Sequence, residues 1–178
     1  MRQLMLLRHA KSTWDDASMP DRDRPLNARG RRSAVVMRQA MRDLGLAPDV
    51  VLVSTARRTM ETLELLEPFD DAPLIEPMDT LYLANPFQLT AALHGVAETV
   101  RSVLLIGHNP GLHDLALTLA GPVQVASGTA AARALAAGFP TGALAEFVVA
   151  GSWWDLREGG GRLVRFLTPR MLEAAGEF

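Results

Sequence analysis

Short runs of consecutive apolar residues recur along the chain and end abruptly at polar residues. Three of them, at residues 4–7, 50–53 and 103–106, contain no polar position. A run without alternation is typical of a strand that is covered on both faces, as in a parallel sheet between helices. Further strands are predicted at residues 73–75, 144–149 and 163–167. The last two, joined by a turn containing three glycines at 159–161, read as an antiparallel pair.

Helical segments are predicted between these strands. Asn27 can cap a helix that continues through Met37 and Met41 and ends near Gly45. Other helices are predicted through residues 59–66, 85–96, 112–119 and 130–137, with Gly121 and Gly138 ending the last two. This alternation predicts an α/β fold, a three-layer α/β/α sandwich with a mostly parallel sheet. The 178 residues, without a repeat or a linker, predict a single domain.

The three uninterrupted strands lead into chemically active residues. The first is followed by Arg8 and His9, the second by Arg58 a few residues later, and the third by His108. Ligands of open α/β sheets bind at the carboxyl ends of the strands, so these side chains are expected to converge. Arginine offers a two-pronged donor to phosphate oxygens, and histidine can attack, donate a hydrogen bond or carry charge. The sequence therefore predicts a phosphoryl-binding site.

The same segments resemble three motifs of the histidine phosphatase superfamily, to which the cofactor-dependent phosphoglycerate mutases also belong. The motifs are Leu-Arg-His-Ala-Lys at 7–11, a serine, arginine and threonine spaced by four at 54, 58 and 62, and Ile-Gly-His-Asn-Pro at 106–110. The spacing selects Arg58 over its neighbour Arg57. The short chain and the Arg-Pro-Leu segment at 24–26 are most similar to the SixA-type phosphohistidine phosphatases.

This resemblance implies a role for each matched residue. His9 is the expected nucleophile, and Arg8, Arg58 and His108 are expected to bind the phosphoryl oxygens. Phosphoryl transfer depends mainly on positioning and charge neutralisation, which such a set supplies. His9 must be unprotonated at its attacking nitrogen, with the other nitrogen donating to a group such as a backbone carbonyl. Water then hydrolyses the phosphohistidine, and neither a metal nor another cofactor is implied.

The spacing does not single out a general acid. Glu76, Asp79, Asp15 and Asp16 are all candidates, whereas larger members of the superfamily take a carboxylic acid from an insertion. An imidazole leaving group needs less help than an alkoxide, which favours phosphohistidine or another activated phosphate as substrate. The expected partner is a phosphorylated protein, such as a histidine-phosphotransfer domain in signal transduction, or a small phosphorylated molecule. The alternatives are a small-molecule phosphomonoesterase or mutase of the same superfamily, and a non-catalytic phosphate-binding module.

Other polar and aromatic residues have simpler interpretations. The segment Asp21-Arg22-Asp23 lies in a polar stretch and is expected to be a solvated turn, while Arg24 stands in a context that recurs in the resembling family. His94 and His113 are expected to be structural or flanking, and Trp153 and Trp154 to pack over the sheet edge. A basic cluster could meet an acidic protein surface; it comprises Arg22, Arg24, Arg29, Arg31 and Arg32.

Composition narrows the function classes further. The absence of cysteine excludes disulfides, thiolate catalysis and cysteine metal sites. A net charge of −2 gives no reason to expect binding to nucleic acid or an anionic membrane. The first apolar run has only four residues, fewer than the ~7–15 of a signal-peptide core, and no run approaches the ~18 of a membrane span. A cytoplasmic location is expected.

Overall fold

Six strands form one sheet in the computed structural model, which describes residues 1–176. The sheet order is β3-β2-β4-β1-β5-β6; the first four strands run parallel, and β5 and β6 are antiparallel to their neighbours. This confirms the predicted mixed sheet and its antiparallel C-terminal pair. The strands are β1 Arg2–Arg8, β2 Val50–Ser54, β3 Leu74–Met78, β4 Ser102–Gly107, β5 Leu144–Val149 and β6 Gly161–Leu167.

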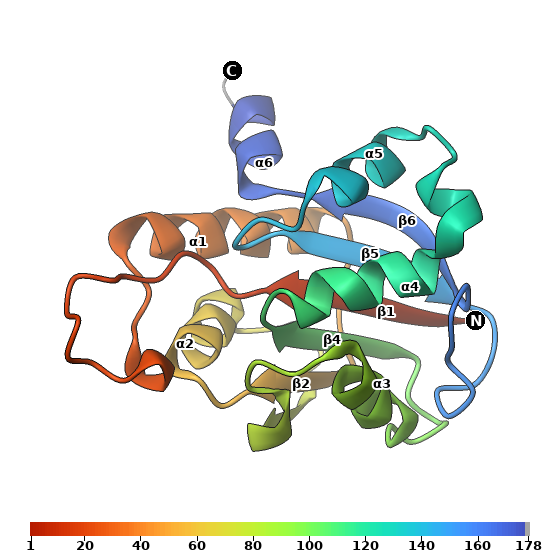
Figure 1. Cartoon of the computed structure of the whole chain (residues 1–178), viewed down its shortest axis with the longest axis horizontal. Helices are drawn as coiled ribbons and strands as arrows, with labels where there is room; N and C mark the ends of the chain where they lie inside the picture. The colour runs from red at the N-terminus through yellow and green to blue at the C-terminus, as the bar shows by residue number, and fades with distance from the viewer. Residues whose placement is uncertain (177–178) are drawn as a thin grey trace.

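Helices cover both faces of the sheet, which explains the apolar runs (Figure 1). Within β1, Leu4 and Leu6 belong to the core beneath α3, α4 and α5, whereas Met5 and Leu7 belong to the core beneath α1, α2 and α6. All four side chains are at most 1% exposed. The helices are α1 Ala28–Asp43, α2 Arg57–Leu66, α3 Pro86–His94, α4 Gly111–Val125, α5 Ala130–Ala137 and α6 Pro169–Ala175; the 3₁₀ helices are η1 Asp21–Asp23 and η2 Asp79–Leu81.

Four details differ from the sequence-based expectations. Strand β3 extends to Met78, and α6, capped by the Thr168 side chain, was not predicted. Gly121, at φ 74°, breaks the helical path as expected, but a further turn continues α4 to Val125. Trp153 is fully buried and its Nε1 donates to the Val100 carbonyl at 2.8 Å, whereas Trp154 is exposed. The expectation that both tryptophans pack against the sheet is therefore wrong for Trp154.

The fold anchors the segment that leaves β1. The arrowheads of β1, β2 and β4 point to the same edge, where residues 10–27 form a projecting loop (Figure 1). The Asn27 side chain caps α1 by accepting from the Gly30 amide at 2.8 Å, and the Asn27 amide donates to the Lys11 carbonyl at 3.0 Å. A Cβ at Gly30 would lie 2.1 Å from that carbonyl oxygen, so only glycine permits this approach. In residues 1–176, no helix is long and apolar enough for a membrane crossing.

Candidate active site

His9 follows β1 directly and is 6% exposed. Its Nδ1 lies 2.7 Å from the Ala10 carbonyl oxygen. Since a carbonyl only accepts, Nδ1 carries the proton and Nε2 keeps a lone pair. Arg58 Nε donates to this Nε2 at 3.3 Å, and the Ala10 amide donates to Thr62 Oγ1 at 3.0 Å. The expected backbone-carbonyl partner of His9 is confirmed, and α2 fixes the loop around it.

His108 reaches the same place from the end of β4. Its ring centroid lies 5.3 Å from that of His9, and the Tyr82 ring packs edge-on against it at 5.5 Å. Its Nε2 is 2.7 Å from Ser54 Oγ, whereas its buried Nδ1 has no hydrogen-bond partner among the described residues. The serine of the second motif therefore orients the histidine of the third.

Two arginines complete the predicted set. Arg58 is 2% exposed, and its Nη1 and Nη2 donate to the backbone carbonyl and the side chain of Asp21 at 2.8 and 3.0 Å. Arg8 Nη1 donates to the Phe139 carbonyl at 3.0 Å. Burial lowers the pKa of Arg8, and the nearby charge of Arg58 adds to this effect. The structure thus brings all four predicted residues, Arg8, His9, Arg58 and His108, to one place.

These side chains line a pocket of about 350 Å³ at the carboxyl edge of the sheet. Small-molecule sites commonly measure ~300–1,000 Å³, so a phosphoryl group and part of its leaving group fit. Four cationic residues and a single carboxylate face the space among the residues described. The lining consists of Arg8, His9, Lys11, Ser12, Trp14, Asp21, Arg24, Arg58, Leu83, His108, Asn109 and Thr141.

Asp21 is the pocket residue that sequence reasoning missed. The segment is a short turn without a buried residue, as expected, but the Asp21 carboxylate is not free. Arg24 Nε donates to Oδ1 at 3.0 Å, and Arg58 Nη2 and the Tyr82 hydroxyl donate to Oδ2. Burial raises the pKa of this carboxyl, but the hydrogen bonds from Tyr82, Arg58 and Arg24 outweigh it and lower the pKa to about 2. Asp21 is therefore ionised and serves as the acceptor at the centre of the network. The one signal in the sequence is its spacing of three from Arg24.

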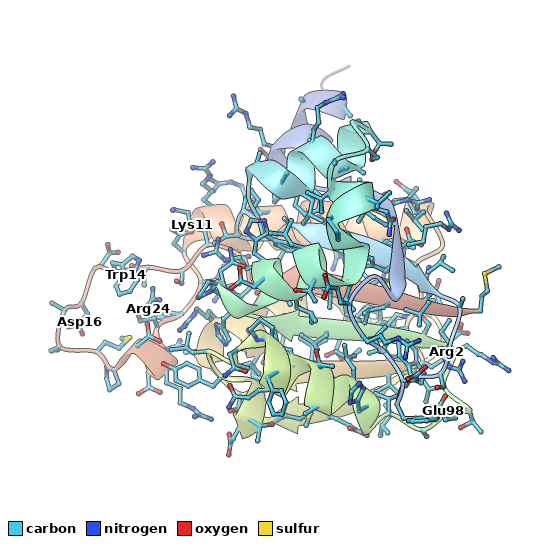
Figure 2. All side chains as sticks on the ribbon, turned by 45° about the vertical axis from the view of Figure 1, so that its right-hand side comes forward. Arg2, Lys11, Trp14, Asp16, Arg24 and Glu98 are labelled. Atoms are coloured by element: carbon cyan, nitrogen blue, oxygen red, sulfur yellow. The ribbon has the colours of Figure 1, made fainter. Side chains whose placement is uncertain are left out.

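None of the four candidate acids lines this pocket. Glu76 lies on β3 and faces a separate cavity beside α3. Asp79 is exposed, pairs with Arg22 and accepts from the Thr55 hydroxyl. Asp15 and Asp16 are exposed in the projecting loop, and Figure 2 shows Asp16 at its outer end. The structure therefore places all four away from His9.

Arg24 joins the site from the far side of the projecting loop. It is 6% exposed, its Nη1 donates to Ser12 Oγ at 2.7 Å and to the Thr13 carbonyl at 3.1 Å, and its guanidinium lies 3.4 Å from the centroid of the Trp14 ring. Figure 2 shows Trp14 and Arg24 facing each other within this loop. Arg24 is therefore the third arginine of the pocket and, like Arg58, a buried one.

The two histidines outside the pocket have structural roles. His94 Nε2 lies 2.8 Å from the Leu156 carbonyl oxygen, and His113 Nε2 lies 2.7 Å from that of Leu135, as expected for structural residues.

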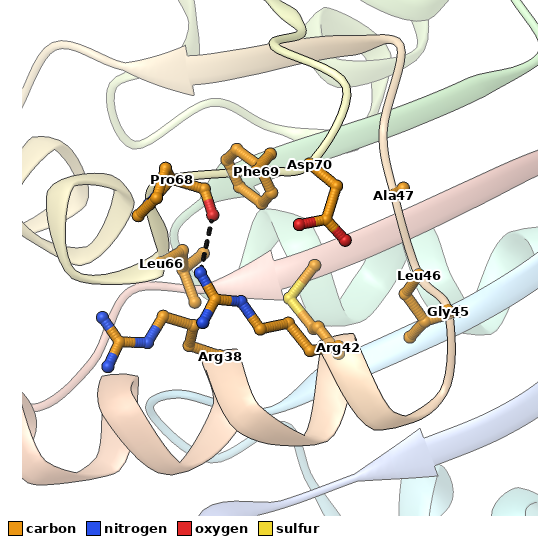
Figure 3. A pocket seen from close by; sticks show the side chains of 10 residues that line it. Arg38, Arg42, Gly45, Leu46, Ala47, Leu66, Pro68, Phe69 and Asp70 are labelled. Atoms are coloured by element: carbon orange, nitrogen blue, oxygen red, sulfur yellow. Dashed lines mark hydrogen bonds between the residues drawn. The ribbon is translucent and has the colours of Figure 1, made fainter.

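A cavity of about 40 Å³ lies between the end of α1 and the segment after α2, where Arg42 donates to the Pro68 carbonyl at 2.9 Å (Figure 3). This volume suits one or two water molecules.

We expect the free energy of unfolding to fall as the pH is lowered from about 6.5. Burial lowers the pKa of both His9 and His108 to about 3, and neighbouring positive charges add to this effect. The unfolded chain binds these protons near pH 6.5, whereas the folded protein excludes them, so acid favours unfolding by on the order of a few kcal/mol per histidine. Urea unfolding between pH 7 and 4.5 measures the slope. Replacement of His108 by Asn should make the free energy of unfolding depend less steeply on pH. An unchanged slope would contradict the attribution of the pH dependence to the buried, neutral histidines.

Comparisons with known proteins agree with this geometry. Residues 4–79 match the histidine phosphatase superfamily (branch 1). An uncharacterized protein of Mycobacterium tuberculosis is 39% identical over 166 residues, covering 92% of this chain and 100% of the relative. A solved SixA structure from Nakamurella multipartitia has 29% identity and a TM-score of 0.82, over 94% of this chain and 96% of its own.

A second solved structure, the protein histidine phosphatase SixA complexed with tungstate, has 26% identity and a TM-score of 0.71. The alignment covers 96% of this chain and 99% of the SixA chain. Together with the three motifs and the arrangement of their residues around one pocket, these similarities establish the family. The chain belongs to the histidine phosphatase superfamily, in its SixA-type branch.

Proposed function

We propose that the protein is a phosphatase that transfers a phosphoryl group to His9 Nε2 and then to water. The observation that carries this proposal is the state of His9: Nδ1–H donates to the Ala10 carbonyl, and the Nε2 lone pair meets a donor of the buried Arg58. A neutral imidazole fixed in this tautomer is a competent nucleophile at neutral pH. Burial, which lowers the pKa of His9 to about 3, keeps it in that form.

In the first step, the Nε2–P bond forms while the bond between phosphorus and the leaving group breaks. Arg8, Arg58 and the neutral His108 hold the phosphoryl oxygens, and the charged donors of the two arginines stabilise a transition state of spread negative charge. The Ala10 carbonyl stabilises the proton on Nδ1 as the ring gains positive charge. In the second step water attacks phosphorus, the P–Nε2 bond breaks, and His9 is regenerated as inorganic phosphate leaves.

We further propose an activated phosphate as substrate, with phosphohistidine in a protein as the favoured case. Asp21 is the single carboxylate among the described residues that line the pocket, and it is an ionised acceptor rather than a proton donor. A missing general acid costs a reaction about 10²–10⁴-fold in rate when the leaving group needs protonation. A phosphorylated protein such as a histidine-phosphotransfer domain, or a small phosphorylated molecule of similar reactivity, fits this requirement. We also propose that the enzyme acts in the cytoplasm.

A substrate panel with phosphoenzyme trapping tests the proposal. We expect kcat/KM for a phosphohistidine peptide and for phosphoramidate to exceed that for alkyl phosphates by about 10² or more. A brief reaction with ³²P-phosphohistidine peptide should leave a label on the enzyme that is labile in acid and stable in alkali. Equal turnover of alkyl phosphates would overturn the preference. Bound phosphate with no turnover of any compound would favour a non-catalytic phosphate-binding module.

A further inference from the structure

A second hollow, of about 300 Å³, adjoins the active-site pocket and shares Lys11 and Thr141 with it. We call it the basic annex. Four separate segments build it: the loop after β1, the first turns of α1, the segment between α5 and β5, and the first turn of α6. Its lining consists of Lys11, Arg29, Ser33, Pro140, Thr141, Thr168, Pro169 and Arg170.

Part of the lining of the annex is buried and closely packed. Ser33, Thr168 and Pro169 are buried. Gly142, at φ 76°, comes so close to α6 that a Cβ there would lie 2.9 Å from Pro169 Cγ. The Thr168 hydroxyl caps α6 by accepting from the Met171 amide at 3.2 Å. The residues that carry charge, by contrast, are exposed to solvent.

The charges of the annex are unpaired. Lys11, Arg29 and Arg170 make no side-chain hydrogen bond or ion pair with another described residue, and no carboxylate is among the lining residues. Three arginines of the basic cluster behave differently. Within residues 1–176 they pair with acids: Arg22 with Asp79, Arg24 with Asp21 and Arg31 with Glu61. Of that cluster, Arg29 is the member that faces the annex.

We propose that the basic annex binds an acidic side chain of the protein substrate while the phosphoryl group lies at His9. This inference rests on the proposed function and adds a determinant of substrate choice. Charge complementarity carries it: three cations without partners adjoin the pocket, and Lys11 borders both spaces. Trp14 and Leu83, 74% and 53% exposed, line the pocket as well, so a protein surface can contact the rim as a whole. Tryptophan and arginine are enriched where proteins bind one another.

Two phosphohistidine peptides that differ only in flanking Glu or Gln residues test the annex. We expect wild-type kcat/KM to favour the Glu peptide by about 3- to 10-fold, and high salt to reduce this ratio. The double variant R29Q/R170Q should bring the ratio close to one. Arg32→Gln is the matched control, because Arg32 is an exposed cation of α1 that does not line the annex. It should retain the wild-type ratio.

Turnover of phosphoramidate in the same preparations reports on the proposed function separately. If phosphoramidate and both peptides are not hydrolysed, the proposed function fails, and the annex is then judged by peptide affinity in fluorescence anisotropy. The affinity ratio of the two peptides should change in R29Q/R170Q and not in R32Q. The proposal that the annex binds an acidic side chain is overturned if the ratio of the two peptides is the same in wild type and R29Q/R170Q. It is also overturned if R32Q lowers this ratio as much as the double variant does.

Discussion

Replacement of His9 by Ala is expected to lower kcat for a phosphohistidine peptide by about 10⁴-fold or more, the loss typical when a nucleophile is removed. The reason is chemical: His9 Nε2 is the ring nitrogen that lies against Arg58 Nε, whereas Nε2 of the other pocket histidine, His108, contacts Ser54 Oγ. The acid-labile label should disappear together with turnover. Steady-state kinetics and ³²P trapping measure both.

The His9 variant should still bind phosphate, because Arg8, Arg24, Arg58 and His108 remain in the pocket. Titration with inorganic phosphate therefore distinguishes a lost nucleophile from a damaged fold. His94→Ala is the matched control, since His94 contacts the Leu156 carbonyl rather than the pocket, and it should retain turnover. If the His9 variant keeps activity within tenfold of wild type, the nucleophile lies elsewhere.

The central strands and the predicted site could be found from sequence for the same physical reason. Strands buried on both faces must be apolar at every position, so β1, β2 and β4 stand out as runs, and the first polar residue after each marks the end of the strand. Parallel strands bring those ends to one edge. Arg8, His9 and His108 therefore follow from local pattern. Arg58 shares the first turn of α2 with Arg57 and is distinguished from it by the serine-arginine-threonine spacing of the second motif.

Asp21 could not be found this way, because its role depends on contacts between distant segments. Its partners Arg58 and Tyr82 are 37 and 61 residues away along the chain, and the loop around it has no periodic pattern. The same limit applies to the basic cluster. Its arginines look equivalent in sequence, yet the positions of Glu61 and Asp79 decide which of them are paired.

Replacement of Arg58 by Lys is the second large effect, and we expect it to lower kcat/KM by about 10²–10³-fold. Lysine keeps the positive charge but cannot reproduce three directed contacts: Nε to His9 Nε2, Nη1 to the Asp21 carbonyl and Nη2 to the Asp21 carboxylate. The arginine therefore fixes both the nucleophile and the loop that carries Asp21, and charge alone is not sufficient.

The neighbouring residue provides the matched control. Arg57 is exposed and pairs with Glu61 at 3.6 Å, so Arg57→Lys should leave kcat/KM near the wild-type value. The contrast isolates directed geometry from charge, because the two variants make the same substitution one residue apart on α2. A loss in Arg57→Lys equal to that in Arg58→Lys would mean that the effect does not come from the directed contacts of Arg58. Full activity in Arg58→Lys would mean that its positive charge is sufficient, and Arg58 would then lose its assignment as the residue that fixes the nucleophile and binds the phosphoryl oxygens.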